Sequence, residues 1–196
     1  MNVDLKGHGV EHFETDRIVG RRLMPTHVDF LSELHQDGEV MKIHGGERSS
    51  EITERFVQSN VAHWRRFQFG LWIISLAESP DIPIGRAGLR WDRVFDDSQA
   101  CDISCLLVKD QWGKGIGTET VKASIAIGLH LGLPLVAGSE ARHDAARRVM
   151  AKAGLIYWSD YSRNQRTWSK YQWPIEARPP ATVTGIEAED ATSSLF

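Results

Sequence analysis

The sequence predicts an α/β (α+β) fold in which one mixed sheet of about six or seven strands is flanked by about four helices. Apolar segments of strand length occur together with segments whose apolar residues repeat at helical spacing. In residues 101–138 a strand, a glycine-rich turn, a helix and another strand follow one another, which is the order of a right-handed parallel crossover. The chain has 196 residues and is 41% hydrophobic, enough for a single domain with a substantial core.

The N-terminal part is predicted to supply one strand and two helices. Residues 1–13 are polar and contain glycine, so we expect a flexible arm, followed by a domain that spans residues 14–176. Residues 17–23, RIVGRRL, suit a short strand. Apolar residues at helical spacing predict helices in 25–37 and 49–67, and Ser49 or Ser50 is expected to cap the second.

The remaining elements follow from the same patterns. Two strands, 71–78 and 82–91, flank a turn predicted at Ser79-Pro80-Asp81, and a third strand covers 101–108. The patterns then predict a helix at 118–132 and a buried strand at 133–138. They are followed by a predicted helix at 143–154, which ends at Gly154, and a hairpin of the strands 155–161 and 166–173. Residues 177–196 have no apolar periodicity and are predicted to be a disordered tail.

Composition and charge argue against several classes of protein. The formal net charge of −3 argues against a nucleic-acid-binding surface. No apolar run approaches the roughly 18 residues that a membrane span needs, and the N-terminus has no apolar signal core, so we expect a cytoplasmic protein. His8 and His12 are four residues apart but have no further ligands nearby, so no metal is expected. Cys101 and Cys105 are expected to be buried thiols of one strand.

Residues 109–119, KDQWGKGIGTE, place three alternating glycines between a strand and a helix. The first turn of a helix has free N–H groups at the positive end of its dipole, and glycines let an anion approach the backbone. This turn is therefore predicted to bind a phosphate group. The run differs from a Walker loop, because Lys114 is followed by Gly115, and from the G-x-G-x-x-G fingerprint, because its glycines occupy every second position.

The same run resembles motif A of the GNAT superfamily of N-acyltransferases, Q/R-x-x-G-x-G/A, with Gly115 and Gly117 at its later glycine positions and Trp112 at its first. The Trp of WGKG is similar to the RimJ/RimL-type branch. The resemblance covers about residues 14–173 and includes, in the family's order, ETDRIVGRRL, HQDGEVMKIHGG, HWRRFQFGLWII with IPIGRAGLRW, and DAARRVMAKAGLIY. It implies a single GNAT-like domain with a splay between the two central parallel strands.

The resemblance implies acetyl-CoA as co-substrate. Backbone groups of the glycine turn would hold its pyrophosphate: Trp112, Gly113, Lys114, Gly115, Ile116, Gly117 and Thr118. The preceding strand would bind the pantetheine at Leu106, Leu107 and Val108, with the Leu107 amide as oxyanion donor. His143 occupies the position where many relatives carry an Asn near the cofactor, and Glu140 is a candidate general base.

The activity that the resemblance implies is direct acetyl transfer to a primary amine, on either a small molecule or a peptide. The family's Ser and its acid Tyr fall on Ala146 and Met150, so a non-catalytic acyl-CoA-binding or regulatory module is the alternative. Asp102 is a second candidate base, and Tyr157 and Tyr161 are candidate cleft residues. A further alternative is a protein-interaction domain or homodimer that uses the aromatic hairpin with Trp158, Trp168 and Trp173.

Overall fold

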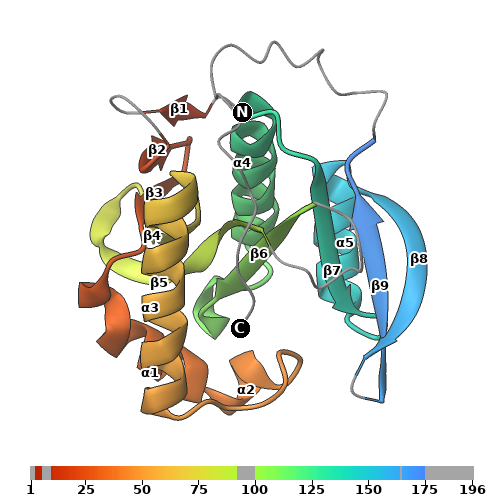
Figure 1. The fold of residues 1–196 in the computed structure, drawn as a ribbon, viewed down its shortest axis with the longest axis horizontal. Helices are drawn as coiled ribbons and strands as arrows, with labels where there is room; N and C mark the ends of the chain where they lie inside the picture. The colour runs from red at the N-terminus through yellow and green to blue at the C-terminus, as the bar shows by residue number, and fades with distance from the viewer. Residues whose placement is uncertain (1–2, 6–9, 92–99, 164, 175–196) are drawn as a thin grey trace, which may run out of the picture.

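The computed structural model describes residues 3–5, 10–91, 100–163 and 165–174 (Figure 1). In this part of the chain, nine strands form a single sheet in the order β1-β2-β3-β4-β5-β6-β7-β9-β8. All neighbouring strands are antiparallel except β6 and β7, which are parallel. The strands are β1 (Asp4–Leu5), β2 (His12–Glu14), β3 (Ile18–Arg22), β4 (Leu71–Leu76), β5 (Ser79–Trp91), β6 (Cys101–Leu107), β7 (Leu135–Glu140), β8 (Ile156–Arg163) and β9 (Arg166–Gln172).

Helices cover both faces of this sheet (Figure 1). They are α1 (Val28–Gln36), α2 (Gly38–Met41), α3 (Ser50–Phe67), α4 (Ile116–His130) and α5 (Asp144–Ala153), with the 3-10 turns η1 (Pro25–His27) and η3 (Lys109–Gln111). Successive residues of β6 face opposite layers, because Leu106 packs with α1, α2 and α3, whereas Leu107 packs with α4. None of the described helices is long and apolar enough to cross a membrane.

The seven predicted strands and the four longer helices are confirmed. Ser49 is the N-cap of α3, and its hydroxyl accepts a hydrogen bond from Ile52 N at 3.4 Å. Gly154 ends α5 with a φ of 94°, in the left-handed region that glycine adopts without strain. Cys101 is buried, Cys105 is partly buried, and both are free thiols.

Two features differ from the expectations. In the segment expected to be a flexible arm, β1 and β2 belong to the sheet, and Phe13 is fully buried edge-to-face against Trp72, with ring centroids 5.3 Å apart. The predicted turn at 79–81 lies instead at 77–78, because Leu76 pairs directly with Ser79. Proline suggested a turn, but register shifts make the ladder irregular here, and an irregular ladder tolerates proline in a strand. The predicted tail, 177–196, lies outside the described residues.

The parallel strands β6 and β7 separate after a short contact. Only Cys101 pairs with Leu135 and Asp102 with Val136, although both strands continue beyond these residues. Figure 1 shows the two strands diverging toward their carboxyl ends. The predicted splay between the central parallel strands is therefore confirmed, and it opens where β6 leads into the start of α4.

Candidate functional site

The glycine turn between β6 and α4 depends on two residues with positive φ. Gly113 has a φ of 73°, and Gly115, the N-cap of α4, has a φ of 81°. Both angles lie in the left-handed region, which favours glycine. Because Gly115 has no side chain with which to cap the helix, the first-turn N–H groups of Ile116, Gly117 and Thr118 are left for a ligand or for water.

Gly117 has no comparable reason to be glycine. A Cβ added at this position would meet Leu107 Cδ1 and Val149 Cγ2 at 3.8 Å, which is an ordinary contact distance. A Cβ added at Gly113 would meet no described atom within 4 Å. The protein itself would therefore accommodate a methyl group at 117, and the open face of this turn fits a bulky anion that approaches the backbone closely.

A carboxylate in the first turn of α4 joins this helix to the segment that leads into β3. Glu119 accepts hydrogen bonds from Thr15 Oγ1 at 2.7 Å, from Arg17 N at 3.1 Å and from Arg17 Nε at 2.6 Å. Arg17 Nη1 also donates to Lys114 O at 3.0 Å. Burial acts to raise the pKa of Glu119, but the hydrogen bonds from Thr15 and Arg17 together outweigh it and lower the pKa. The charge of Arg17 thus offsets a carboxylate that would otherwise oppose an anion at this helix end.

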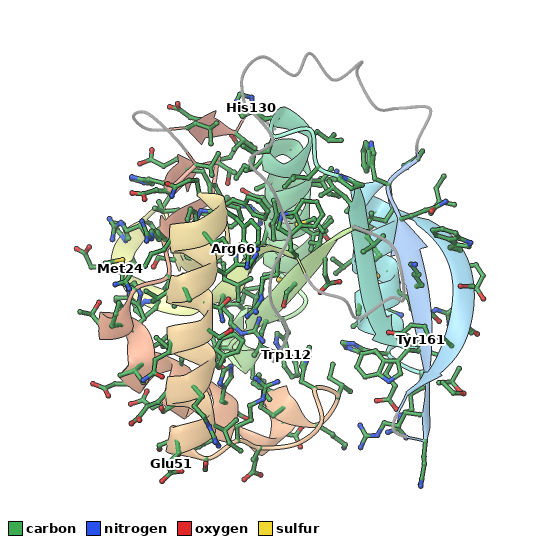
Figure 2. The ribbon with its side chains drawn as sticks, in the orientation of Figure 1. Met24, Glu51, Arg66, Trp112, His130 and Tyr161 are labelled. Atoms are coloured by element: carbon green, nitrogen blue, oxygen red, sulfur yellow. The ribbon has the colours of Figure 1, made fainter. Side chains whose placement is uncertain are left out.

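Trp112 fixes the turn at its β6 end. Its indole Nε1 donates to Leu107 O at 2.9 Å, while 46% of the residue stays exposed. Figure 2 shows Trp112 near the end of β6 at which the strands have separated. A half-exposed indole at this place offers an apolar wall to a ligand that enters the splay.

Backbone N–H groups of β6 point into the splay. The N–H of Cys101 is bonded on the β7 side at 2.7 Å, and that of Val108 is bonded on the β5 side at 2.9 Å. Because N–H groups alternate along a strand, those of Cys105 and Leu107 point to the β7 side, beyond the last residues that β6 and β7 pair. The geometry thus presents backbone donors along the opened edge of β6.

Glu140 and His143 lie at the turn from β7 into α5. The Glu140 carboxylate is 4% exposed and forms ion pairs with Arg142 at 2.5 Å and Arg166 at 3.5 Å. His143 precedes α5 as its N-cap residue, and its backbone N–H donates to Glu140 O at 2.8 Å. Burial lowers the pKa of His143, although the charges of Glu140 and Asp144 act in the opposite direction, so the imidazole is neutral at pH 7.

A second group of polar residues lies on the face of β5 and β6 that α1 and α3 cover. We call His35, Arg48, Phe56, Arg86 and Ser104 the arginine cluster. Arg86 Nε donates to His35 Nε2 at 3.4 Å, and Arg86 Nη1 donates to Ser104 Oγ at 2.8 Å. The guanidinium carbons of Arg86 and Arg48 lie 4.9 and 5.7 Å from the centre of the Phe56 ring, within range of cation–π attraction.

The histidine of the arginine cluster is held neutral. His35 Nδ1 lies 3.0 Å from Thr53 Oγ1. Since His35 Nε2 accepts a hydrogen bond from Arg86, the proton of the neutral ring must be on Nδ1, from which it is donated to Thr53. Burial, to which the charges of Arg86, Arg48 and His44 add, lowers the pKa of His35 to about 3.

Residues 17–156 match the family model of the acetyltransferase (GNAT) domain. The chain belongs to the GNAT acetyltransferase family. This match confirms the predicted resemblance, and solved GNAT structures similar to the chain include a RimL protein.

Three solved GNAT structures illustrate how far the likeness extends. An acetyltransferase from Agrobacterium tumefaciens str. C58 is 19% identical with a TM-score of 0.71, and the alignment covers 84% of this chain and 96% of that one. The RimL ribosomal L7/L12 α-N-protein acetyltransferase in complex with coenzyme A is 17% identical with a TM-score of 0.67, covering 83% and 97%. An aminoglycoside acetyltransferase in complex with coenzyme A is 17% identical with a TM-score of 0.70, covering 82% and 96%. At these identities the likeness shows the fold and leaves the acceptor open.

The GNAT domain brings most of the predicted site residues to one place. The end of β6, residues 106–108, leads directly into the glycine turn, residues 112–118, and Glu140 and His143 lie at the end of the partner strand β7. Tyr157 lies elsewhere. It lines a hollow of about 430 Å³ against α5, together with Asp144, Arg147, Arg148, Ala151, Leu155 and Tyr171.

Two polar groups of this GNAT domain were not predicted from the sequence. Glu119 is an acidic residue in the first turn of a helix, a common position, and nothing local pairs it with Arg17 more than one hundred positions away. The arginine cluster takes its members from α1, the segment before α3, α3 itself, β5 and β6, and His35 and Arg86 are 51 positions apart. Only the folded sheet and the helices on it bring these side chains together.

Proposed function

We propose that this GNAT domain binds acetyl-CoA in the splay between β6 and β7 and transfers its acetyl group to a primary amine. The proposal rests on one observation: the strand β6, which separates from β7, leads directly into the glycine turn at the N-terminus of α4. This one segment therefore offers backbone N–H donors both for a carbonyl oxygen and for phosphates. Two proteins of the same fold, RimL and an aminoglycoside acetyltransferase, hold coenzyme A in their solved structures.

The glycine turn is the proposed pyrophosphate site. The N–H groups from Gly113 to Thr118 and the positive end of the α4 dipole would face the phosphates, whereas the Trp112 N–H is already bonded to Lys109 O at 3.0 Å. The bare backbone at Gly113 and Gly117 leaves room for this approach. Of the three residues predicted to hold the pantetheine, Leu107 would bind it through the N–H at the opened edge of β6. The N–H groups of Leu106 and Val108 point to the β5 side. His143, at the end of the partner strand, would contact the cofactor from the β7 side.

The transfer itself needs orientation, oxyanion stabilisation and removal of a proton. The amine nitrogen attacks the thioester carbonyl, a C–N bond forms, the C–S bond breaks, and coenzyme A leaves as a thiolate. The Leu107 N–H would donate to the oxyanion, and loss of one such donor costs roughly 2.7–4 kcal/mol in other enzymes. A thiol with a pKa of about 8.5 can leave without a dedicated acid, so Met150 at the position of the family's Tyr is compatible with turnover.

The base role predicted for Glu140 stays a prediction. Its buried carboxylate is held between Arg142 and Arg166, and these ion pairs favour a positioning role at the β7–α5 turn. The acceptor must attack as the neutral amine, and the further proton that its nitrogen loses as the C–N bond forms can pass to solvent at the opening of the splay.

An acceptor screen tests the proposal. The protein is incubated with acetyl-CoA and a mixture of peptides, amino acids, polyamines and aminoglycosides, while free coenzyme A thiol is measured and products are identified by mass spectrometry. We expect amine-dependent thiol release and a product heavier by one acetyl group. Binding of acetyl-CoA without transfer to any of these amines would favour the alternative, a non-catalytic acyl-CoA-binding module, which Ala146 and Met150 at the family's Ser and Tyr positions motivate.

A further inference from the structure

We propose that the arginine cluster, together with His44, binds a carboxylate on the amine acceptor, so that the substrate is an amino-acid-like amine and not a polycation. This inference rests on the proposed function, because it assigns the acceptor class of the same site. Three properties of the arginine cluster support the inference: its position on the sheet, its positive charge, and the hydrogen bonds and ring contacts that fix it.

The arginine cluster lies on the face of the sheet opposite the glycine turn. Arg86 pairs in register with Leu106, and Leu106 packs with α1, α2 and α3. The neighbouring residue Leu107 points the other way, toward Gly117 in α4. Arg86 therefore lies beside Leu106, the residue that precedes the proposed oxyanion donor Leu107. Its side chain is on the opposite face of the sheet from the phosphate turn, so it cannot serve as a second phosphate ligand for the cofactor.

The arginine cluster contains a buried cation whose bonded partners are neutral. Arg86 is 5% exposed, and its hydrogen-bond partners are the neutral His35 ring and the Ser104 hydroxyl. Burial, with the charge of Arg48 adding, lowers the pKa of Arg86 only to about 10, so it stays charged at neutral pH. Burial also raises the pKa of the Cys105 thiol to about 12, so this thiol brings no negative charge.

Among the described residues, the Asp102 carboxylate raises the pKa of Arg86, and its effect is smaller than the opposing effect of Arg48. Two guanidinium groups therefore share the Phe56 ring with a net positive charge around them. A buried or partly buried positive charge is stabilised by an anion that forms charge-assisted hydrogen bonds, and the guanidinium fork matches a carboxylate in particular.

The positive charges of the arginine cluster also act on His44, which follows α2. It is half-buried, and burial together with the charges of Arg86, His143 and Arg48 lowers its pKa to about 3. At neutral pH the charges that act on His44 are those of Arg86 and Arg48, because His143 is neutral there. Such surroundings repel a polycationic acceptor, and they also favour the neutral form of an attacking amine.

The arginine cluster is held rigidly before any acceptor binds. Arg48 N donates to His35 O at 2.9 Å, which fixes the segment before α3 against the end of α1. The His35 ring is hydrogen-bonded on both sides, to Thr53 and to Arg86, and packs edge-to-face on Phe56 with centroids 5.2 Å apart. A preorganised pair of arginines is the arrangement expected of a binding site for an anionic group.

Matched acceptors test the inference. L-glutamate, L-glutamine and L-glutamine amide share an α-amine and a shape but carry two, one and no carboxylates, and spermidine and kanamycin represent polycations. We expect kcat/KM to fall by about tenfold or more when the recognised carboxylate becomes an amide, the factor typical of a lost hydrogen bond to a charged group. In Arg48→Gln this preference should shrink toward unity through KM, with unchanged affinity for acetyl-CoA.

The matched control is Arg55→Gln, the same change at an exposed residue of α3, which should keep the wild-type preference. A second readout needs no turnover: isothermal titration of N-acetyl-L-glutamate and of its diamide into the coenzyme A complex. The carboxylate form should bind at least about tenfold more tightly than the diamide, and Arg48→Gln should remove the difference.

The outcomes separate the two proposals. No binding of acetyl-CoA would defeat the proposed function itself. If acetyl-CoA binds but spermidine or kanamycin is the better acceptor, the carboxylate site is overturned and the proposed function stands. Equal affinity for the two N-acetyl compounds would have the same meaning. An unchanged carboxylate preference in Arg48→Gln would overturn the carboxylate site as well.

Discussion

Gly117 is a residue at which the fold does not require glycine, so its presence points to a requirement of the ligand. Gly113 and Gly115 have positive φ and serve the turn itself, whereas Gly117 lies in α4 where a Cβ would meet only ordinary contacts. Glycine in a helix destabilises it relative to alanine. A residue that weakens the fold and relieves no crowding is best explained by close approach of a ligand to the backbone.

Gly117→Ala should therefore change stability and cofactor affinity in opposite directions. We expect the free energy of unfolding to rise by about 0.5 kcal/mol, because alanine is the better helix residue, and the affinity for coenzyme A to fall, because the methyl group occupies the phosphate approach. Urea denaturation and isothermal titration measure the two quantities. A variant that is more stable and binds coenzyme A as tightly as the wild type would contradict this role for Gly117.

His35 should make the fold sensitive to acid. Its pKa is about 3 in the folded protein, against 6.5 in the unfolded chain. Between these values only the unfolded chain takes up the proton, so the free energy of unfolding falls as the pH drops below about 6.5, by up to about 1.4 kcal/mol per pH unit for one histidine. His44, whose pKa is also lowered to about 3, acts in the same direction.

His35→Gln removes one of these titrations, and its amide can replace both ring contacts. We expect its stability to fall less steeply than that of the wild type between pH 7 and pH 4, as measured by urea denaturation at several pH values. The variant keeps the contribution of His44, so a smaller slope should remain. Equal slopes in the two proteins would show that His35 is not held neutral.

Among the elements, the short helix α2 matters most for the proposed carboxylate site, because the segment after it carries His44 and Arg48. Asp37 caps α2: its carboxylate accepts hydrogen bonds from Glu39 N at 2.9 Å and from Val40 N at 3.1 Å. A helix of four residues has little stability of its own, so its cap and the buried Val40 and Met41 hold it in place.

Asp37→Ala should loosen this segment, whereas Asp37→Asn keeps an oxygen that can cap the helix. We expect the alanine variant to lose about 1 kcal/mol of unfolding free energy and to show a higher KM for the acceptor, with the affinity for acetyl-CoA unchanged. The asparagine variant should resemble the wild type in both measurements. If both variants bound the acceptor equally well, α2 would have no part in positioning the arginine cluster.

For the whole molecule, the sequence was sufficient for features that depend on local patterns. Apolar periodicity and turn residues predicted seven strands and four helices, and the glycine run predicted a glycine-opened helix N-terminus after β6. That this turn binds an anion stays a prediction. Because this run also carries the family's motif, the splay between β6 and β7 was expected before the structure showed it. These features depend on residues that are close together in the chain.

Features that depend on distant residues could not be predicted. Phe13 appeared to belong to a polar arm, and it becomes a core residue only because Trp72 and the strand β3 lie beside it. Arg86 was one charged residue in an apolar strand, and its role depends on His35, Ser104 and Phe56 from three other elements. Long-range side-chain pairing is set by the tertiary fold, which no local pattern encodes.

Whether the β6–α4 turn is a cofactor site can be measured by titrating acetyl-CoA into the wild-type protein and into Gly115→Glu by isothermal calorimetry. Gly115→Asn, an uncharged residue that tolerates positive φ, is the matched control. We expect saturable binding at a single site in the wild type and the control, and none in Gly115→Glu, because its carboxylate would lie among the amides that face the pyrophosphate. No binding to the wild type at millimolar acetyl-CoA, or unchanged affinity in Gly115→Glu, would contradict a cofactor site at this turn.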